Sequence, residues 1–217
     1  MLYLDHIIWT GDNIEKVSDQ YGKDFAVKSV KGGEHEDWGT FNYLTHMSNN
    51  CYLEWLGIRD MKRAEMQEMP LIQHLTYALN NGIHGPFQFA LRTNKINAYI
   101  DHFKQNDIPF NGPIVGERRK PNGQLLSWRM VFPHGDYKNG EVIPFLIEWD
   151  QPEHKRVDVS LINHQAITDI YLSGVTKDRF SHIFHLPNKK LGGNKIKLPN
   201  TRIHFTDHPD PIQMKLS

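Results

Sequence analysis

An internal repeat constrains this chain more than any other feature, because it predicts two copies of one folding unit. Residues 4–9 and 86–91 are both rich in β-branched or aromatic side chains, and each segment leads through turn and helix-cap residues into apolar positions at helical spacing. His6 and Gln88 both lie eight positions before the first apolar residue of the predicted helix. These two polar residues therefore hold equivalent places in the repeat.

Each unit also ends on a predicted strand in which a glutamate precedes a tryptophan. Glu54 and Glu148 hold these places, within residues 51–56 and 144–149. An apolar strand rarely carries a carboxylate without a partner, so both glutamates are candidates for a functional site. Two shorter strands with turn residues, such as those at 121–123, lie between the ends of each unit. Each unit is thus predicted to have the element order βαβββ.

We predict an α+β fold in which two βαβββ modules form one cup-shaped sheet. The modules comprise residues 1–60 and 86–150. Residues 61–85 connect them through a helix that has Pro70 in its first turn. The remaining residues, 151–217, contain two further predicted strands and a helix, and they resemble a truncated third module.

The charge balance and the motifs exclude several classes of partner. The chain has 25 basic and 25 acidic residues, so it lacks the positive charge that nucleic acid or an anionic membrane surface would attract. Its single Cys51 excludes a disulfide framework and a cysteine-cluster zinc site. Glycine-rich nucleotide motifs and the hydrolase nucleophile motif are absent. We expect a cytoplasmic protein with a small-molecule substrate or ligand, and a homodimer stays open as its assembly.

Four repeat-related side chains can face the inside of the cup if the modules pair through their first strands. His6, Glu54, Gln88 and Glu148 would then supply one imidazole nitrogen and three oxygen donors. That donor set suits a six-coordinate divalent ion, with two positions left for water or substrate. The alternative is a buried His6 that is hydrogen-bonded to one of the glutamates without any metal.

At these positions the sequence resembles the vicinal oxygen chelate superfamily, and most closely its glyoxalase-like members. The resemblance covers about residues 2–150 and is most specific in the G-G-x-H-x-x-x-G-T-x-N stretch at residues 32–42. The other matching segments are L-D-H at 4–6, Y-L-E at 52–54, R-R-K-P-N-G at 118–123, W-R at 128–129 and P-F-L-I-E-W at 144–149.

The resemblance implies paired modules around a ligand cup and, in many members, a divalent metal that chelates adjacent oxygens of the substrate. The usual metal positions of the superfamily fall on His6, Glu54, Gln88 and Glu148. Gln88 departs from the commonest dioxygenase pattern and is closer to the mixed His, Gln and Glu set of glyoxalase I. Zinc, nickel, manganese and magnesium are the candidate ions.

Polar residues near the predicted rim of the cup are candidates for binding the substrate. Two glycines before His35 predict a sharp turn, and the acidic neighbours of His35 should favour its protonated form. The alternative to a substrate-binding role is a turn histidine that is bonded to a carboxylate. Thr40 and Asn42 alternate along the next strand and can both point inward. Arg118 and Arg129 suit a carboxylate substrate. The alternative for Arg118 is a surface salt bridge, and the alternative for Arg129 is an ion pair with a structural glutamate.

Two functions are compatible with these residues. The first is a metal-dependent lyase or isomerase, in which the metal stabilises an enediolate of a small carbonyl or hydroxy compound while Glu148 or Glu54 moves a proton. The second is a metal-free cup that sequesters an aromatic or carboxylate-bearing molecule, as the resemblance to bleomycin-resistance proteins implies. The aromatic faces available for stacking are those of Trp9, Trp38, Trp55, Trp128 and Trp149.

Overall fold

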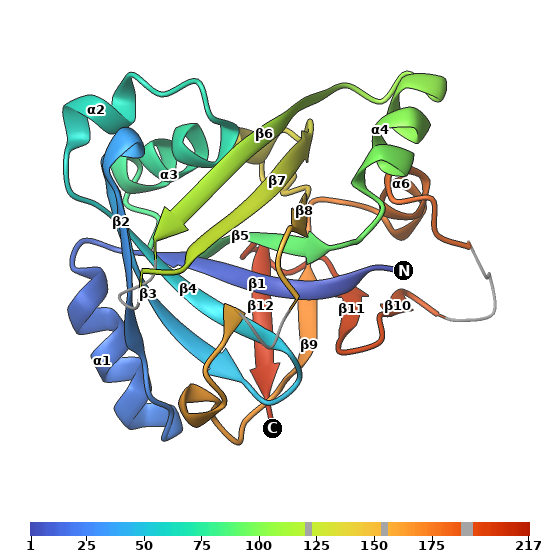
Figure 1. The fold of residues 1–217 in the computed structure, drawn as a ribbon. Helices are drawn as coiled ribbons and strands as arrows, with labels where there is room; N and C mark the ends of the chain where they lie inside the picture. The colour runs from blue at the N-terminus through green and yellow to red at the C-terminus, as the bar shows by residue number, and fades with distance from the viewer. Residues whose placement is uncertain (120–122, 153–155, 188–192) are drawn as a thin grey trace.

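The computed structural model describes residues 1–119, 123–152, 156–187 and 193–217. Its strands form a curled sheet of eight strands and a separate sheet of four strands, which lies beside it (Figure 1). Among the described residues, no helix has the length and apolar composition that a membrane crossing requires.

The first module has the predicted order of one strand, one helix and three strands. Its elements are β1 (Tyr3–Thr10), α1 (Ile14–Phe25), β2 (Val30–His35), β3 (Thr40–Met47) and β4 (Cys51–Ile58). Asn13 begins α1 by accepting a hydrogen bond at 3.0 Å from the backbone N–H of Lys16. β1 is parallel to β4, so the module closes on its own first strand.

The second module repeats this arrangement. Its elements are β5 (Gly85–Arg92), α4 (Ile96–Gln105), β6 (Phe110–Arg119), β7 (Leu125–Pro133) and β8 (Phe145–Trp149). β5 is parallel to β8 and antiparallel to β1, so the modules pair through their first strands and the sheet has the order β2-β3-β4-β1-β5-β8-β7-β6. The prediction of an α+β fold with paired βαβββ modules in a cup-shaped sheet is therefore confirmed.

Two helices between the modules lie together at one end of the curled sheet (Figure 1). They are α2 (Met61–Glu65) and α3 (Pro70–Asn80), and α3 is the helix that the sequence predicts from its proline. α3 packs on β1 and β5, where Ile72 joins a buried apolar cluster with Ile8 and Ala90. The connector thus covers part of the inner face of the sheet.

The C-terminal segment forms the second sheet. Its elements are β9 (Ile167–Leu172), α6 (Lys177–Ile183), β10 (Lys195–Lys197), β11 (Arg202–Phe205) and β12 (Ile212–Leu216). β9 is parallel to β11, as β1 is to β4, and β12 is antiparallel to β9, as β5 is to β1. The segment therefore reproduces part of a module, and β12 has the position relative to β9 that β5 has relative to β1.

The face of the curled sheet opposite α3 is also buried. Ile14 of α1, Phe103 of α4, Phe180 of α6 and Ile170 of β9 belong to one apolar cluster with Trp55 of β4. Because both faces of the central strands are covered, their apolar residues do not alternate with polar ones as they would in a sheet with one wet face.

The glycine pair at residues 32–33 does not form the turn that the sequence predicts. Both glycines lie within β2, and the chain turns later, in the short 3-10 helix η1 (Glu36–Trp38). Gly39 ends that turn with a φ of +67°, which glycine adopts at little cost. Of the turn predicted at residues 121–123, only Gly123 lies within the described part of the chain.

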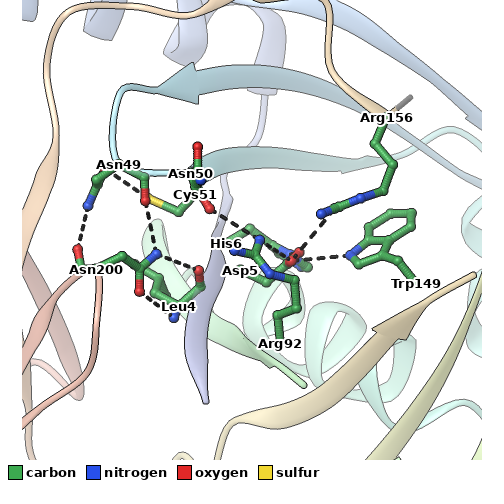
Figure 2. A network of polar contacts seen from close by, with 10 residues as sticks. All are labelled: Leu4, Asp5, His6, Asn49, Asn50, Cys51, Arg92, Trp149, Arg156 and Asn200. Carbon is green, nitrogen blue, oxygen red and sulfur yellow. Dashed lines mark hydrogen bonds and ion pairs between the residues drawn. The ribbon is translucent and has the colours of Figure 1, made fainter. Parts of the chain in front are cut away.

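Asn200 ties the C-terminal segment to the first strand of the larger sheet (Figure 2). Its side chain accepts a hydrogen bond from the N–H of Leu4 and donates one to the carbonyl of Leu4, both at 2.9 Å. It also donates to the carbonyl of Asn49 at 3.0 Å. Asn49 in turn donates to the carbonyl of Ile167 at 2.8 Å, so four chain segments meet at this point.

We expect Asn200→Ala to lower the free energy of unfolding by about 3 kcal/mol, because three side-chain hydrogen bonds worth about 1 kcal/mol each are lost. Urea denaturation followed by tryptophan fluorescence measures this change. Asn80→Ala is the matched control, since Asn80 is exposed at the end of α3, and it should change stability by less than about 0.5 kcal/mol. Equal stability of the two variants would contradict the assigned role of Asn200.

Candidate functional site

A pocket lies inside the curl of the larger sheet, between the sheet and the connector. It contains about 740 Å³ of empty space, part of which is open to solvent. The first module lines it with several polar side chains, whereas β7, β8 and the connector line it with apolar ones. A concave site of this kind, mostly apolar with a few polar groups, is typical of small-molecule binding.

His6 of β1 and Glu54 of β4 lie side by side in this pocket. His6 Nε2 is 3.4 Å from Glu54 Oε2, and both residues are less than a tenth exposed. Asn42 of β3 donates a hydrogen bond to Glu54 Oε1 at 2.6 Å and so fixes the carboxylate. An imidazole and a carboxylate in this geometry can hold and transfer a proton, which makes them a candidate acid–base pair.

The other side of the His6 ring contacts Asp5. His6 Nδ1 is 2.8 Å from Asp5 Oδ1, and because a carboxylate only accepts hydrogen bonds, the proton of this contact belongs to Nδ1. A bulge in the pairing of β1 with β5 between Leu4 and His6 makes the contact possible. The bulge also places Leu4 in the outer cluster while His6 faces the pocket, although regular strand alternation would put the two residues on one face.

Asp5 is the centre of a buried ionic network (Figure 2). It is fully buried, and its Oδ2 accepts hydrogen bonds from Arg92 Nη1 and Trp149 Nε1, both at 3.1 Å. Arg156 Nη1 is 3.9 Å from the same oxygen. Burial by itself raises the pKa of the Asp5 carboxyl, but the hydrogen bond with His6 and the charges of His6, Arg92 and Arg156 lower it to about 2. Asp5 therefore stays ionised and anchors the ring of His6.

His35 also lines the pocket, at the end of β2. Its Nδ1 is 3.0 Å from Oγ1 of Thr40, which is buried and does not itself line the pocket. Burial lowers the pKa of His35, the positive charge of Arg118 lowers it further, and the negative charge of Glu54 opposes both. The expectation that acidic neighbours keep His35 protonated is therefore wrong, because the effect of burial on its pKa outweighs the attraction of Glu54.

Arg118 reaches into the pocket across the opening between the two edge strands, β6 and β2. A Cβ atom placed on Gly33 would lie 3.0 Å from Arg118 Cδ, and one on Gly32 would lie 3.0 Å from Nη1 and 2.2 Å from Asn42 Oδ1. The glycine pair thus leaves room for the guanidinium and for Asn42. Within the described residues no carboxylate forms an ion pair with Arg118, so its charge is available to a ligand.

Glu148 does not join this site. Ile147 and Trp149 line the pocket, so strand alternation directs Glu148 to the outer face of β8. There its Oε1 accepts a hydrogen bond at 3.3 Å from the N–H of Ile96, at the start of α4, and its Oε2 binds Arg129. The expectation that Glu148 acts as a catalytic group or metal ligand in the cup is therefore wrong.

Arg129 is on the same outer face. Its neighbours Trp128 and Met130 line the pocket, which leaves Arg129 opposite Glu148 in the pairing of β7 with β8. Arg129 also donates a hydrogen bond to Asn97 Oδ1 at 3.1 Å. Of the two alternatives drawn from the sequence, a carboxylate substrate and a structural glutamate, the structure has the glutamate.

Gln88 is buried but its amide is already bonded within the protein. Nε2 donates to the carbonyl of Ile143 at 3.2 Å, and Oε1 accepts from the N–H of Phe89 at 2.8 Å. Only His6 and Glu54 of the four expected ligands converge, and the described part of the chain contains no group of three or more histidine, cysteine or acidic side chains arranged to hold a metal. The donor set that the family pattern implies therefore does not fit a metal here.

Several residues in or directly behind the pocket were not predicted from the sequence. Asp5 carried a usable signal, since it is a carboxylate in an apolar strand, like the two glutamates. Arg156, whose guanidinium lies 4.8 Å above the ring of Trp149, carried none, because it lies after the second predicted module and outside the repeat. Tyr52 stacks on His6 with ring centres 4.6 Å apart.

Three of the five tryptophans considered line the pocket, namely Trp38, Trp128 and Trp149. The other two, Trp9 and Trp55, pack with the outer cluster.

Comparison with known proteins gives one family match. The model of a family described as a glyoxalase-like domain matches residues 4–185. A comparison with curated proteins finds no match.

Solved structures share the fold. A hypothetical protein from Staphylococcus aureus is 19% identical with a TM-score of 0.78, and the match covers 99% of this chain and 91% of that one. Methylmalonyl-CoA epimerase from Mycobacterium tuberculosis is 17% identical with a TM-score of 0.51, over 71% of this chain and 91% of that one. A hypothetical protein from Bacillus halodurans C-125 is 15% identical with a TM-score of 0.50, over 70% of this chain and 96% of that one.

Proposed function

The chain belongs to the glyoxalase-like domain family, and from that premise we propose that its cup binds a small carboxylate-bearing carbonyl or hydroxy compound and moves a proton on it. The reaction class is that of an isomerase or lyase that passes through an enolate of a carbonyl compound or an enediolate of a hydroxy compound. A structure with the same fold is an epimerase, so the fold accommodates isomerase chemistry. Glu54 and His6 are the proposed acid–base groups.

The line of contacts from Asp5 through His6 to Glu54 is the observation that carries this proposal. Asp5 holds the proton of His6 on Nδ1, which turns Nε2 toward Glu54 and the pocket. Glu54, fixed by Asn42, removes a proton from the carbon beside the carbonyl, and His6 accepts or returns it. The apolar surroundings strengthen these electrostatic interactions because little water competes for them.

Arg118 supplies the complementary positive charge. Its planar guanidinium can bind a carboxylate through two parallel hydrogen bonds, and the same charge stabilises the negative charge that develops on an enolate or enediolate. Its position over the glycine pair of β2 places it at the first-module side of the pocket, where Glu54 and His35 also lie. His35, whose pKa is lowered, adds a neutral imidazole to the same wall.

A second candidate function is binding without reaction. Trp128 and Trp149 have ring centres 5.0 Å apart in the pocket and offer aromatic faces for a planar ligand. A protein that sequesters such a molecule would need the pocket and Arg118 but not the pairing of His6 with Glu54. Proton exchange therefore separates the two functions.

Proton NMR in D₂O tests the proposed reaction. The protein is incubated with a panel of 2-oxo and 2-hydroxy acids, and deuterium incorporation beside the carbonyl or hydroxyl group is followed against a protein-free sample. We expect the protein to accelerate exchange of at least one acid, and we expect Arg118→Met to raise the acid concentration needed for half the maximal rate about tenfold or more. Arg59→Met is the control, because Arg59 is exposed and pairs with Glu34 outside the pocket.

The same experiment run with a chelator tests whether protein groups are sufficient. Exchange that continues at the same rate in excess chelator supports the proposed roles of Glu54 and His6. Exchange that requires an added divalent ion would contradict them. Binding of an acid without any exchange would favour the sequestering function.

A further inference from the structure

The polar and apolar residues of the pocket lie on opposite walls. The first-module wall carries His6, Asn42 and Glu54. The side chain of Arg118 extends from β6 of the second module to the same wall, beside the glycine pair of β2. A cup that held a metal between both modules would have polar ligands on each wall. Here the reactive groups lie on one wall only, so a bound molecule has one polar end.

The second-module wall is apolar. Leu126, Met130, Phe145 and Ile147 line it, and each is at most 3% exposed. Phe145 is held in place by stacking on Phe132, with ring centres 4.8 Å apart. Leu71 and Ile72 of α3 extend the apolar surface along the connector side. The hydrogen-bonding side chains on this wall are Trp128 and Trp149, whose indole N–H groups only donate. The N–H of Trp149 is already bonded to Asp5, so the described part of the wall offers little to replace the water around a polar substituent.

The charges of the pocket limit the ligand further. Arg118 is available to one anionic group, whereas Arg156 is engaged by Asp5 and by the ring of Trp149. A second carboxylate on the ligand would have to lie against the apolar wall. Burying a charge or a hydroxyl group there without a partner costs more than an apolar group of the same size would gain.

We propose that the ligand of this pocket is an amphipathic monocarboxylate, with its carboxylate on Arg118 and an unbranched or aromatic apolar tail against the second-module wall. This inference rests on the proposed function for the position of the carboxylate and names the class of substrate. It excludes sugar acids, dicarboxylates and nucleotides as the preferred ligands.

Calorimetric titration with a homologous series tests the proposal. The probes are the 2-oxo acids with three to six carbons, with 2-oxoglutarate as the dicarboxylate and the amide of the six-carbon acid as the uncharged analogue. We expect the dissociation constant to fall about fourfold for each added methylene group, since each buries apolar surface on the second-module wall. 2-Oxoglutarate and the amide should each bind at least tenfold more weakly than the six-carbon acid.

Two variants locate the tail. Met130→Gln puts a polar group of similar length on the apolar wall and should weaken the six-carbon acid several-fold while leaving the three-carbon acid unchanged. Met130→Leu keeps the wall apolar and is the matched control. Affinity that is independent of tail length, or higher for 2-oxoglutarate, would overturn the inference even if Met130→Gln failed to fold, because the wild-type series decides it.

The result also distinguishes this inference from the proposed reaction. Rising affinity along the series with no deuterium exchange would retain the ligand class and reject the acid–base roles of Glu54 and His6. Exchange of short acids without any gain from longer tails would retain those roles and reject the ligand class. Absence of binding by every carboxylate would reject both.

Discussion

Glu54→Gln should reduce protein-catalysed deuterium exchange by about 10²- to 10⁴-fold, the usual contribution of a positioned acid–base group. A glutamine amide has nearly the shape of the carboxylate but cannot take up a proton from carbon. Since Glu54 also accepts the hydrogen bond of Asn42, the amide oxygen can keep that contact and the fold should be retained. The initial rate of exchange under saturating acid, followed by NMR, measures the effect.

Glu148→Gln is the matched control, because Glu148 holds the equivalent place in the second module. On the outer face it contacts Arg129 and the N–H of Ile96, so its replacement removes an ion pair but leaves the pocket intact. We expect less than a twofold change in exchange rate. Equal losses in the two variants would mean that the repeat-related glutamates act together, and the assignment of Glu54 alone would be wrong.

Asp5→Ala should lower the free energy of unfolding by about 3–5 kcal/mol, the largest loss of stability that we expect from one substitution. The change leaves the charges of Arg92 and Arg156 and the indole N–H of Trp149 without their buried acceptor. Chemical denaturation measures it. Asp101→Ala, at an exposed position on α4, should change stability by less than about 0.5 kcal/mol.

The ionisation of Asp5 also predicts how stability depends on pH. Its pKa falls from the ordinary 3.8 to about 2 on folding, so the folded state binds its proton more weakly than the unfolded chain does. The corresponding stabilisation of about 2 kcal/mol is fully present above pH 4 and is lost as the pH falls through about 2.

Asp5→Asn isolates this contribution, because it keeps the size of the side chain and removes its titration. The difference in unfolding free energy between wild type and Asp5→Asn should shrink by about 2 kcal/mol between pH 5 and pH 2. A difference that is constant over this range would show that Asp5 does not titrate as the network requires.

The sequence predicted the architecture because its signals are local and occur twice. Strand, cap and helix patterns recur around His6 and Gln88, and the repeat itself implies that the modules pair. The connector helix was predicted from Pro70 for the same reason, since proline in a first turn is a local preference. The sequence also placed His6 and Glu54 on the first and last strands of the first module, from where both could face the cup.

The side of a strand on which a residue lies could not be predicted in the same way. Both faces of β8 and β7 are buried, so apolar residues on each side hide the alternation that would distinguish Ile147 from Glu148 or Met130 from Arg129. A bulge at Asp5 adds one residue to β1 and reverses the faces on either side of it. Such irregularities depend on the neighbouring strand, which the local sequence does not specify.

The sequence alone thus determined the paired modules, the cup and the presence of an imidazole and a carboxylate at its centre. Only the tertiary structure decided that Glu148 lies on the outer face, that the amide of Gln88 is bonded within the protein, and that Asp5 and Arg118 contribute to the site. The physical reason is that these residues lie far apart in the sequence and meet only when the sheet forms. Arg118 meets the glycine pair of β2 because the sheet curls until its edge strands approach each other, and that curl is a property of all eight strands together.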